Sequence, residues 1–147
     1  FVTGISYNAK GQRERIDYGN STFTTYSYET ETFRLTGLKT TRTSDSKELQ
    51  DISYTYDPVG NITNITDNSQ DRVFTNNQNV EPKHEYIYDA LYRLVEANGR
   101  EHTALNNPDY YKNQDSFMRS AFANINDSNA LANYTRNYTR SVDLLYL

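Results

Sequence analysis

Two aspartates occupy matching places in the sequence and are the first candidates for acid–base chemistry. Asp57 and Asp89 each follow a Tyr-x-Tyr triplet, within the stretches Ile52–Asp67 and Glu85–Asn98. Two carboxylates act as a general acid and a general base when a shared pocket moves their pKa values apart. Repetition in separate copies supplies no such pocket, whereas a side chain that bonds the backbone ahead of it explains both positions. We therefore interpret both aspartates as turn-forming residues.

The other candidates for catalysis or ligand binding stand alone in the sequence. His84 and His102 have no cysteine or carboxylate cluster at ligand spacing, which argues against a metal site. The chain has no cysteine, no glycine-rich phosphate loop and no serine nucleophile elbow. We therefore predict no catalytic, cofactor-binding or metal-binding residue in this segment, and no enzyme activity.

The 14 tyrosines permit two interpretations. Exposed phenol rings beside Asn and Asp side chains could bind carbohydrate, which would make the chain a glycan-binding repeat module at a cell surface. Alternatively, the rings form cross-strand ladders that hold a sheet together. We favour the ladders, because tyrosine prefers strands in any case.

The stretch Ile52–Asp67 has the local chemistry of a β-hairpin. Tyr54 and Tyr56 are two residues apart and therefore share one face of a strand. Asp57-Pro58-Val59-Gly60 matches a type I turn, with Asp, Pro and Gly at the positions that suit them. The run that follows, Asn61–Thr66, is rich in β-branched residues. The pattern predicts strand, turn and strand.

The stretch Glu85–Asn98 repeats this pattern less closely. Ala90 replaces the turn proline and Tyr92 replaces the turn glycine, so we expect a locally weaker turn that relies on tertiary packing. The residues to which we assign a structural role in the repeats are Tyr54, Tyr56, Asp57, Gly60, Tyr86, Tyr88, Asp89, Arg93 and Leu94.

The rest of the chain divides into three expected regions. Residues 1–105 form a repeat β-sheet segment, residues 106–133 a loop and short helical insertion, and residues 134–147 the start of a further degenerate or truncated repeat. Apolar spacing places the helix near 116–125. The further strands expected in the first region are Gly4–Tyr7, Gln12–Tyr18, Ser21–Tyr28, Leu35–Thr41, Val73–Phe74 and Arg100–Leu105. We expect Gly37 to interrupt the strand Leu35–Thr41. We also expect Gly99 to end the preceding strand, so that Arg100–Leu105 pairs back as a new one.

Composition limits the classes of function. The net charge of −4 is small and well mixed, which gives no footprint for nucleic acid or an anionic membrane. No apolar run reaches transmembrane length. The chain starts without Met or a signal peptide, so we expect a piece of something longer. The supply of aliphatic residues is thin, and we expect tyrosines to carry much of the packing.

The repeated motifs resemble the Rhs/YD-repeat family, whose consensus is roughly Tyr-x-Tyr-Asp-x-x-Gly-Arg-Leu. Residues 54–62 and 86–94 match well, and residues 7–11 and 26–29 match in part. Longer phrases, YNAKGQRERIDYGN, YTYDPVGNIT and YDALYRLVEANGREH, resemble the C component of bacterial tripartite insecticidal toxin complexes. The departures are Tyr92 for glycine, one inserted residue before Arg34, and a broken last repeat.

The resemblance implies a function that composition does not indicate. In this family the repeats build an antiparallel sheet that spirals into a hollow shell, made with a B component and enclosing a toxic C-terminal segment. The expected partners are thus other YD repeats of the parent chain and a B-type component, and the expected location is secreted. Self-cleavage residues of the family lie beyond the repeats, so none is carried over to this chain.

Overall fold

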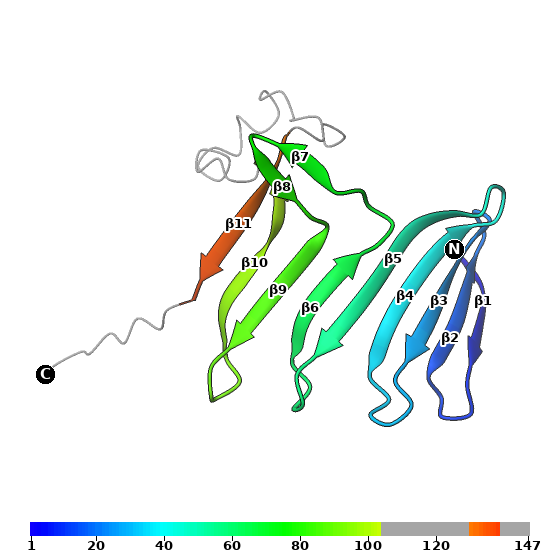
Figure 1. Ribbon diagram of the computed structural model, residues 1–147. Helices are drawn as coiled ribbons and strands as arrows, with labels where there is room; N and C mark the ends of the chain where they lie inside the picture. The colour runs from blue at the N-terminus through cyan, green and yellow to red at the C-terminus, as the bar shows by residue number, and fades with distance from the viewer. Residues whose placement is uncertain (104–129, 139–147) are drawn as a thin grey trace, which may run out of the picture.

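The computed structural model describes residues 1–103 and 130–138, and these residues form antiparallel strands joined by turns (Figure 1). The mainly β fold expected from the sequence is confirmed. The strands are β1 (Val2–Tyr7), β2 (Arg13–Tyr18), β3 (Thr22–Tyr28), β4 (Leu35–Arg42), β5 (Lys47–Tyr56), β6 (Ile62–Asp67), β7 (Val73–Thr75), β8 (Gln78–Val80), β9 (Lys83–Tyr88), β10 (Leu94–His102) and β11 (Leu131–Asn137).

Nine of the strands in the described residues make one antiparallel sheet, in the order β1-β2-β3-β4-β5-β6-β9-β10-β11. The sheet forms a single twisted strip, with β1 and β11 as its edges (Figure 1). The hairpin of β7 and β8 is inserted between β6 and β9 and contacts β11. Order in space thus follows order in the chain, as expected for hairpins added one after another.

Four hairpins of the strip share one irregularity next to their turn. In β1–β2, β3–β4, β5–β6 and β9–β10, the strand that leaves the turn carries one residue that pairs with nothing opposite. Such a β-bulge bends the strand and increases its twist. The bulged residues are Glu14, Thr36, Thr63 and Val95. Because the bulge recurs at one position, it belongs to the repeat.

Alternation along the strands sorts side chains onto two faces of the strip. The register places the paired tyrosines of three strands on one face, which we call the tyrosine face: Tyr26, Tyr28, Tyr54, Tyr56, Tyr86 and Tyr88. The opposite face, called the polar face, carries side chains such as Lys39, Asp51, Ser53, Thr66, Lys83, Glu85 and Asn98.

Few side chains of the described residues are buried. On the tyrosine face Ile16, Thr24 and Ala97 are covered, with 6%, 3% and 3% of their surface exposed. Val80 in the β7–β8 hairpin is fully covered. A strip with so thin an apolar core must be stabilised by its hydrogen-bonded ladders and by the bodies of its tyrosine rings.

Two expected strand boundaries are wrong, and both concern glycine. Gly37 does not interrupt its strand, because it pairs with Ser27 on one side and Ser53 on the other. Gly99 does not end a strand either, since β10 runs through it to His102. The strand expected at Arg100–Leu105 is therefore the second half of β10, and its partner is β11.

Other boundaries differ by a few residues. Lys47 begins β5, although the sequence placed it in a loop. The short strand expected at Val73 and Phe74 is confirmed as β7, and its partner is β8. The helix expected near 116–125 lies outside the described residues. Among the residues that the structure does describe, none belongs to a helix long and apolar enough to cross a membrane.

Candidate interaction site: the turns and tyrosines that join the repeats

The turns of the four bulged hairpins share one pattern of backbone hydrogen bonds. In each, the first residue donates its N–H to the carbonyl of the last, at 2.9 to 3.0 Å. The four pairs are Asn8 and Gln12, Glu29 and Arg34, Asp57 and Asn61, and Asp89 and Arg93. The turn of β3–β4 is one residue longer, as the sequence predicts.

The side chain of the first residue closes three of these turns. Asp57 Oδ1 accepts the N–H groups of Gly60 and Asn61, at 2.7 and 2.8 Å. Asp89 Oδ1 accepts those of Leu91 and Arg93, at 2.8 and 3.0 Å. Asn8 Oδ1 does the same for its own turn. Aspartate and asparagine suit this position because their side-chain oxygen accepts hydrogen bonds from the turn in the way that a backbone carbonyl would.

These contacts decide what the two aspartates can do chemically. Burial alone would raise the pKa of Asp57, but hydrogen bonds from Asn61 and the turn backbone lower it overall. The Arg93 side chain, assisted by backbone N–H groups, lowers the pKa of Asp89. A carboxylate with a lowered pKa stays ionised at neutral pH and cannot act as a general acid there. The geometry therefore favours turn formation over catalysis.

One residue of each turn has a left-handed backbone. It is Gly11, Phe33, Gly60 and Tyr92 in the four turns, with φ of 76°, 60°, 108° and 60°. Glycine adopts this region without strain, and bulky residues rarely do. Tyr92 therefore keeps the turn geometry that its glycine counterpart has. The Asp89 side chain and its ion pair with Arg93, at 2.6 Å, support this turn locally.

The second tyrosine of each triplet bonds to the preceding repeat. Tyr28 Oη donates to the carbonyl of Arg13, at 2.9 Å. Tyr56 Oη donates to Leu35 O at 2.7 Å, and Tyr88 Oη to Ile62 O at 2.9 Å. Each acceptor is the first residue after a turn. We call these three hydrogen bonds the tyrosine joints. Burial raises the pKa of Tyr56, so its hydroxyl remains a protonated donor.

Two turns are also held by a side chain from the turn before. Gln12 Nε2 donates to Phe33 O at 2.9 Å. Arg34 donates through Nη1 to Asp57 O at 3.0 Å and through Nη2 to Pro58 O at 3.1 Å. A Cβ on Gly60 would lie 3.1 Å from Arg34 Nη2. Glycine at this place therefore serves both the turn and the close approach of the guanidinium.

The remaining predicted motif residues lie around these joints. Tyr54 and Tyr86 are the first tyrosines of their triplets and lie two residues before Tyr56 and Tyr88 on the same face. Burial raises the pKa of the Tyr86 phenol. Leu94 is the first residue of β10 and pairs with Tyr88. The predicted residues are thus brought into a repeating array rather than into a single cluster.

The two histidines do not form a metal centre with their neighbours in the described residues. His84 lies against Gly99, where an added Cβ would be 2.2 Å from its Nδ1. Its Nδ1 is 3.4 Å from the Tyr134 hydroxyl. Burial and the nearby charge of Arg100 lower the pKa of His84. This histidine is a packing residue between β9 and β10.

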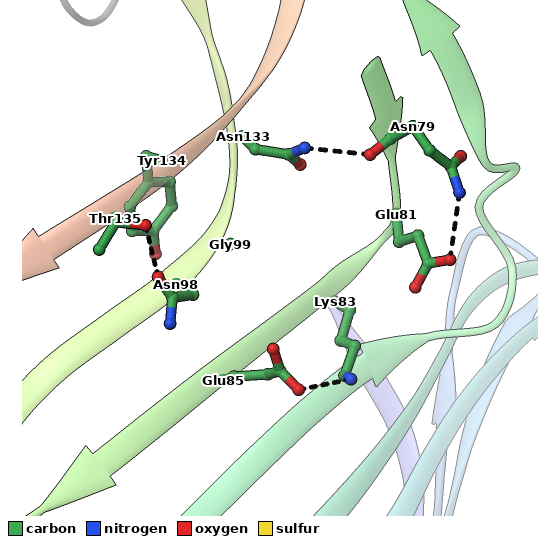
Figure 2. A pocket seen from close by; sticks show the side chains of 9 residues that line it. All are labelled: Asn79, Glu81, Lys83, Glu85, Asn98, Gly99, Asn133, Tyr134 and Thr135. Carbon is green, nitrogen blue, oxygen red and sulfur yellow. Dashed lines mark hydrogen bonds and ion pairs between the residues drawn. The ribbon is translucent and has the colours of Figure 1, made fainter.

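A recess of about 320 Å³ opens on the polar face between the β7–β8 hairpin and strands β9 to β11 (Figure 2). Asn133 Nδ2 reaches across it to Asn79 O at 3.0 Å, which ties β11 to β8. Two further pairs of lining side chains bond one another, Lys83 with Glu85 and Thr135 with Asn98.

Sequence reasoning missed two parts of this array. The role of Arg34 was hidden because its turn is one residue longer than the consensus. The recurring bulge could not be recognised from residue types, because the bulged residues Glu14, Thr36, Thr63 and Val95 have little in common. One signal in the sequence could have indicated that side chains hold the turns. The last turn position is always a residue whose side chain can donate a hydrogen bond: Gln12, Arg34, Asn61 and Arg93.

The described residues form a single-layer antiparallel strip of Tyr-x-Tyr hairpins, each bonded to the one before. This architecture is that of a YD-repeat sheet. Comparison with known proteins agrees. The chain is 45% identical over 141 residues to the toxin subunit YenC1 of Yersinia entomophaga, and 43% identical over 140 residues to YenC2 of the same organism. These matches cover 93% and 92% of this chain and 14% of each relative. No family model matches the chain.

Solved structures give the same result. A crystal structure of TcdB2-TccC3 matches with a TM-score of 0.71 and 43% identity, covering 95% of this chain and 6% of that one. A Photorhabdus luminescens Tc holotoxin pore matches with a TM-score of 0.71 and 43% identity, over 94% and 6%. Over nearly its whole length the chain is similar to these toxin-complex subunits, and its hairpins follow the YD-repeat pattern. It spans about a seventh of the curated relatives.

Proposed function

We propose that this chain is a structural segment of a YD-repeat shell that encloses the toxic C-terminal part of an insecticidal toxin-complex component. The observation that carries the proposal is the series of tyrosine joints, in which each of the four bulged hairpins after the first is bonded to the bulged hairpin before it. Such a series links each repeat to the next and so stabilises a continuous strip. The proposed contribution of the segment is therefore collective and non-catalytic.

The edges of the strip support a place within a longer wall. On β1, Val2, Ile5 and Tyr7 are 50%, 45% and 57% exposed. An edge strand with exposed apolar side chains is a template for a further strand. At the other edge, the Tyr138 N–H donates to Val95 O at 2.9 Å. Val95 is a bulged residue, so Tyr138 lies opposite a bulge in the preceding strand. Tyr54 has the same position, because extending the pairing of β4 and β5 by one residue places Tyr54 opposite the bulged Thr36.

This correspondence supports the expectation that a further repeat begins near residue 134. Tyr138 would take the place that the first tyrosine has in the other triplets. Tyr138 directly follows the last residue of β11, which runs from Leu131 to Asn137. We propose that the neighbours on both edges are other YD repeats of the parent chain, and that a B-type component completes the shell. Secretion follows from the same proposal, because the relatives are toxin subunits.

The glycan-binding alternative rests on the tyrosines and is less well supported. The hydroxyls of Tyr28, Tyr56 and Tyr88 already donate to backbone carbonyls. A sugar would have to compete with these intramolecular bonds. Glycan-array binding that is lost in Tyr54→Ala or Tyr86→Ala, with the sheet still folded, would favour this alternative.

The experiment that tests enclosure uses the full-length subunit that carries this segment, assembled with its B-type partner. We expect the toxic segment to resist added protease in the assembled pair. The triple variant Tyr28→Phe, Tyr56→Phe and Tyr88→Phe should lose much of this resistance, because the wall opens more often. If the toxic segment of the unmodified pair is digested as fast as the free segment, the proposal is wrong.

A further inference from the structure

The last repeat of the chain lacks the tyrosine that makes the joint in the earlier repeats. Each joint tyrosine stands two residues after the first tyrosine of its triplet and donates to the first residue after a turn. With Tyr138 in the first place, the joint residue would be residue 140 and its acceptor Leu94 O. Residue 140 is an arginine. The seam between β10 and β11 is therefore without the phenol donor that supports the earlier repeats.

The connection across this seam is also long. Strand β10 ends at His102 and β11 begins at Leu131, whereas the turns of the four bulged hairpins have five or six residues. Bringing the ends of a longer connection together costs more conformational entropy. The pairing of β11 with β10 therefore depends more on contacts that come from elsewhere in the chain.

The β7–β8 hairpin supplies such contacts, because it lies against the seam and touches β11 with both of its strands (Figure 1). Asn133 Nδ2 of β11 donates to Asn79 O at 3.0 Å (Figure 2). Arg100 Nη1 of β10 donates to Asp71 O, just before β7, at 3.4 Å. The hairpin thus contacts both strands of the seam, and it does so from the polar face, opposite to the tyrosine joints.

The hairpin itself is well defined and packs on the rest of the protein. Asn76 and Asn77 have φ of 49° and 59°, as a two-residue type I′ turn requires. Arg72 and Glu81 form an ion pair across its base, at 3.0 Å. Val80 is fully covered. An isolated two-stranded hairpin is only marginally stable in water, so the covered Val80 shows that the hairpin gains from its packing as well.

The hairpin is not needed to connect the strands between which it is inserted. The Asp67 N–H donates to Pro82 O at 2.9 Å, so the two ends of the insertion already meet where β6 passes to β9. The role of the insertion must then lie where the hairpin reaches, beyond β9 and β10. We propose that the β7–β8 hairpin is a clasp that holds β11 to the sheet, in place of the tyrosine joint that the last repeat lacks.

The test is hydrogen exchange in the full-length subunit that carries this segment, measured on peptides that cover β11 and β5. In the first variant Gly-Gly replaces residues 70–81, which leaves residues 67 and 82 paired across a short loop. Amides of β11 should exchange at least about tenfold faster, because a pairing without its clasp opens more often. Amides of β5 should change by less than about twofold.

A single substitution tests the clasp with the hairpin in place. Asn133→Ala removes the amide that reaches Asn79 O and should speed exchange in β11 by at least about threefold. Asn137→Ala is the matched control, since Asn137 is an exposed asparagine on the same face at the other end of β11. It should leave exchange in β11 unchanged.

A rescue tests the equivalence with a joint. Adding Arg140→Tyr to the variant without the hairpin should slow exchange in β11 again, because it supplies a phenol donor for Leu94 O. The proposal is overturned if exchange in β11 is the same with and without the hairpin, if β5 accelerates as much as β11, or if Asn133→Ala and Asn137→Ala behave alike. A rescue variant that exchanges as fast as its parent overturns the equivalence. These measurements need no enclosed segment, so they are independent of the shell proposal.

Discussion

Removing the hydroxyl of a joint tyrosine should weaken the strip by an amount set by the burial of the joint. Tyr56→Phe deletes the donor of the 2.7 Å bond to Leu35 O and keeps the ring that packs on the tyrosine face. A hydrogen bond contributes about 0.5–1.5 kcal/mol net to stability, and a partly buried acceptor left without its partner lies at the upper end. We therefore expect a loss of about 1–1.5 kcal/mol for Tyr56→Phe.

The other two joints provide an internal scale. The joint made by Tyr88 is also partly buried, at 2.9 Å, so Tyr88→Phe should cost nearly as much. The joint made by Tyr28 is exposed, and Tyr28→Phe should cost about 0.5 kcal/mol, because water replaces the lost donor. Successive joints are about 10 Å apart and share no partner, so the three losses should add.

The assay is urea unfolding of the 147-residue chain followed by circular dichroism, with Tyr92→Phe as the matched control. Tyr92 is 60% exposed in its turn, and removing its hydroxyl should change the free energy of unfolding by less than about 0.5 kcal/mol. The reasoning is refuted if Tyr92→Phe costs as much as Tyr56→Phe, or if Tyr28→Phe costs the most of the three joint variants.

Three further predictions concern glycine and histidine. Gly60→Ala should lower the free energy of unfolding by about 2–3 kcal/mol, since the φ of Gly60 is 108° and the new Cβ would lie 3.1 Å from a guanidinium nitrogen of Arg34. Gly11→Ala is the matched control: Gly11 has open space around it, so this variant should lower the free energy of unfolding by only about 1 kcal/mol in the same urea titration. Gly99→Ala should cost about 1–3 kcal/mol by crowding the His84 ring, and adding His84→Ala should recover much of that loss; an additive double variant would contradict this. The pKa of His84 is lowered in the folded state, so the neutral imidazole favours folding, and the free energy of unfolding should fall as pH drops below 6.5 towards the folded-state pKa. A pH series of unfolding curves for His84→Gln tests this, because a variant that keeps the full dependence of the free energy of unfolding on pH would exclude His84 as its source.

The local chemistry of the turns was predictable from sequence because it is short-ranged. Asp57 and its glycine three residues later form the expected turn, and the paired tyrosines lie on one face as the period of two requires. The alignment of Tyr92 with Gly60 also proved informative. It identified Tyr92 as the place where the repeat departs from its pattern, and the structure adds that this residue is left-handed, with φ of 60°.

Interactions between repeats were not predictable in the same way. Gly99 was expected to end a strand because glycine usually signals a turn, yet its absent side chain makes room for His84 across the ladder. Arg34 holds a turn 23 residues away in the sequence. The β7–β8 hairpin reaches β11 through Asn133, 54 residues from Asn79. Such contacts depend on register and bulges, which the order of residue types does not specify.

The central claim, that this segment is part of a continuous wall, is tested most directly by hydrogen exchange at its outer edge. The measurement compares backbone amides of β1 that point away from β2, in the 147-residue chain and in the full-length subunit assembled with its partner. We expect these amides to exchange at least about 100-fold more slowly in the assembly, because a neighbouring repeat pairs with them. Equal exchange rates in the two forms would contradict the account.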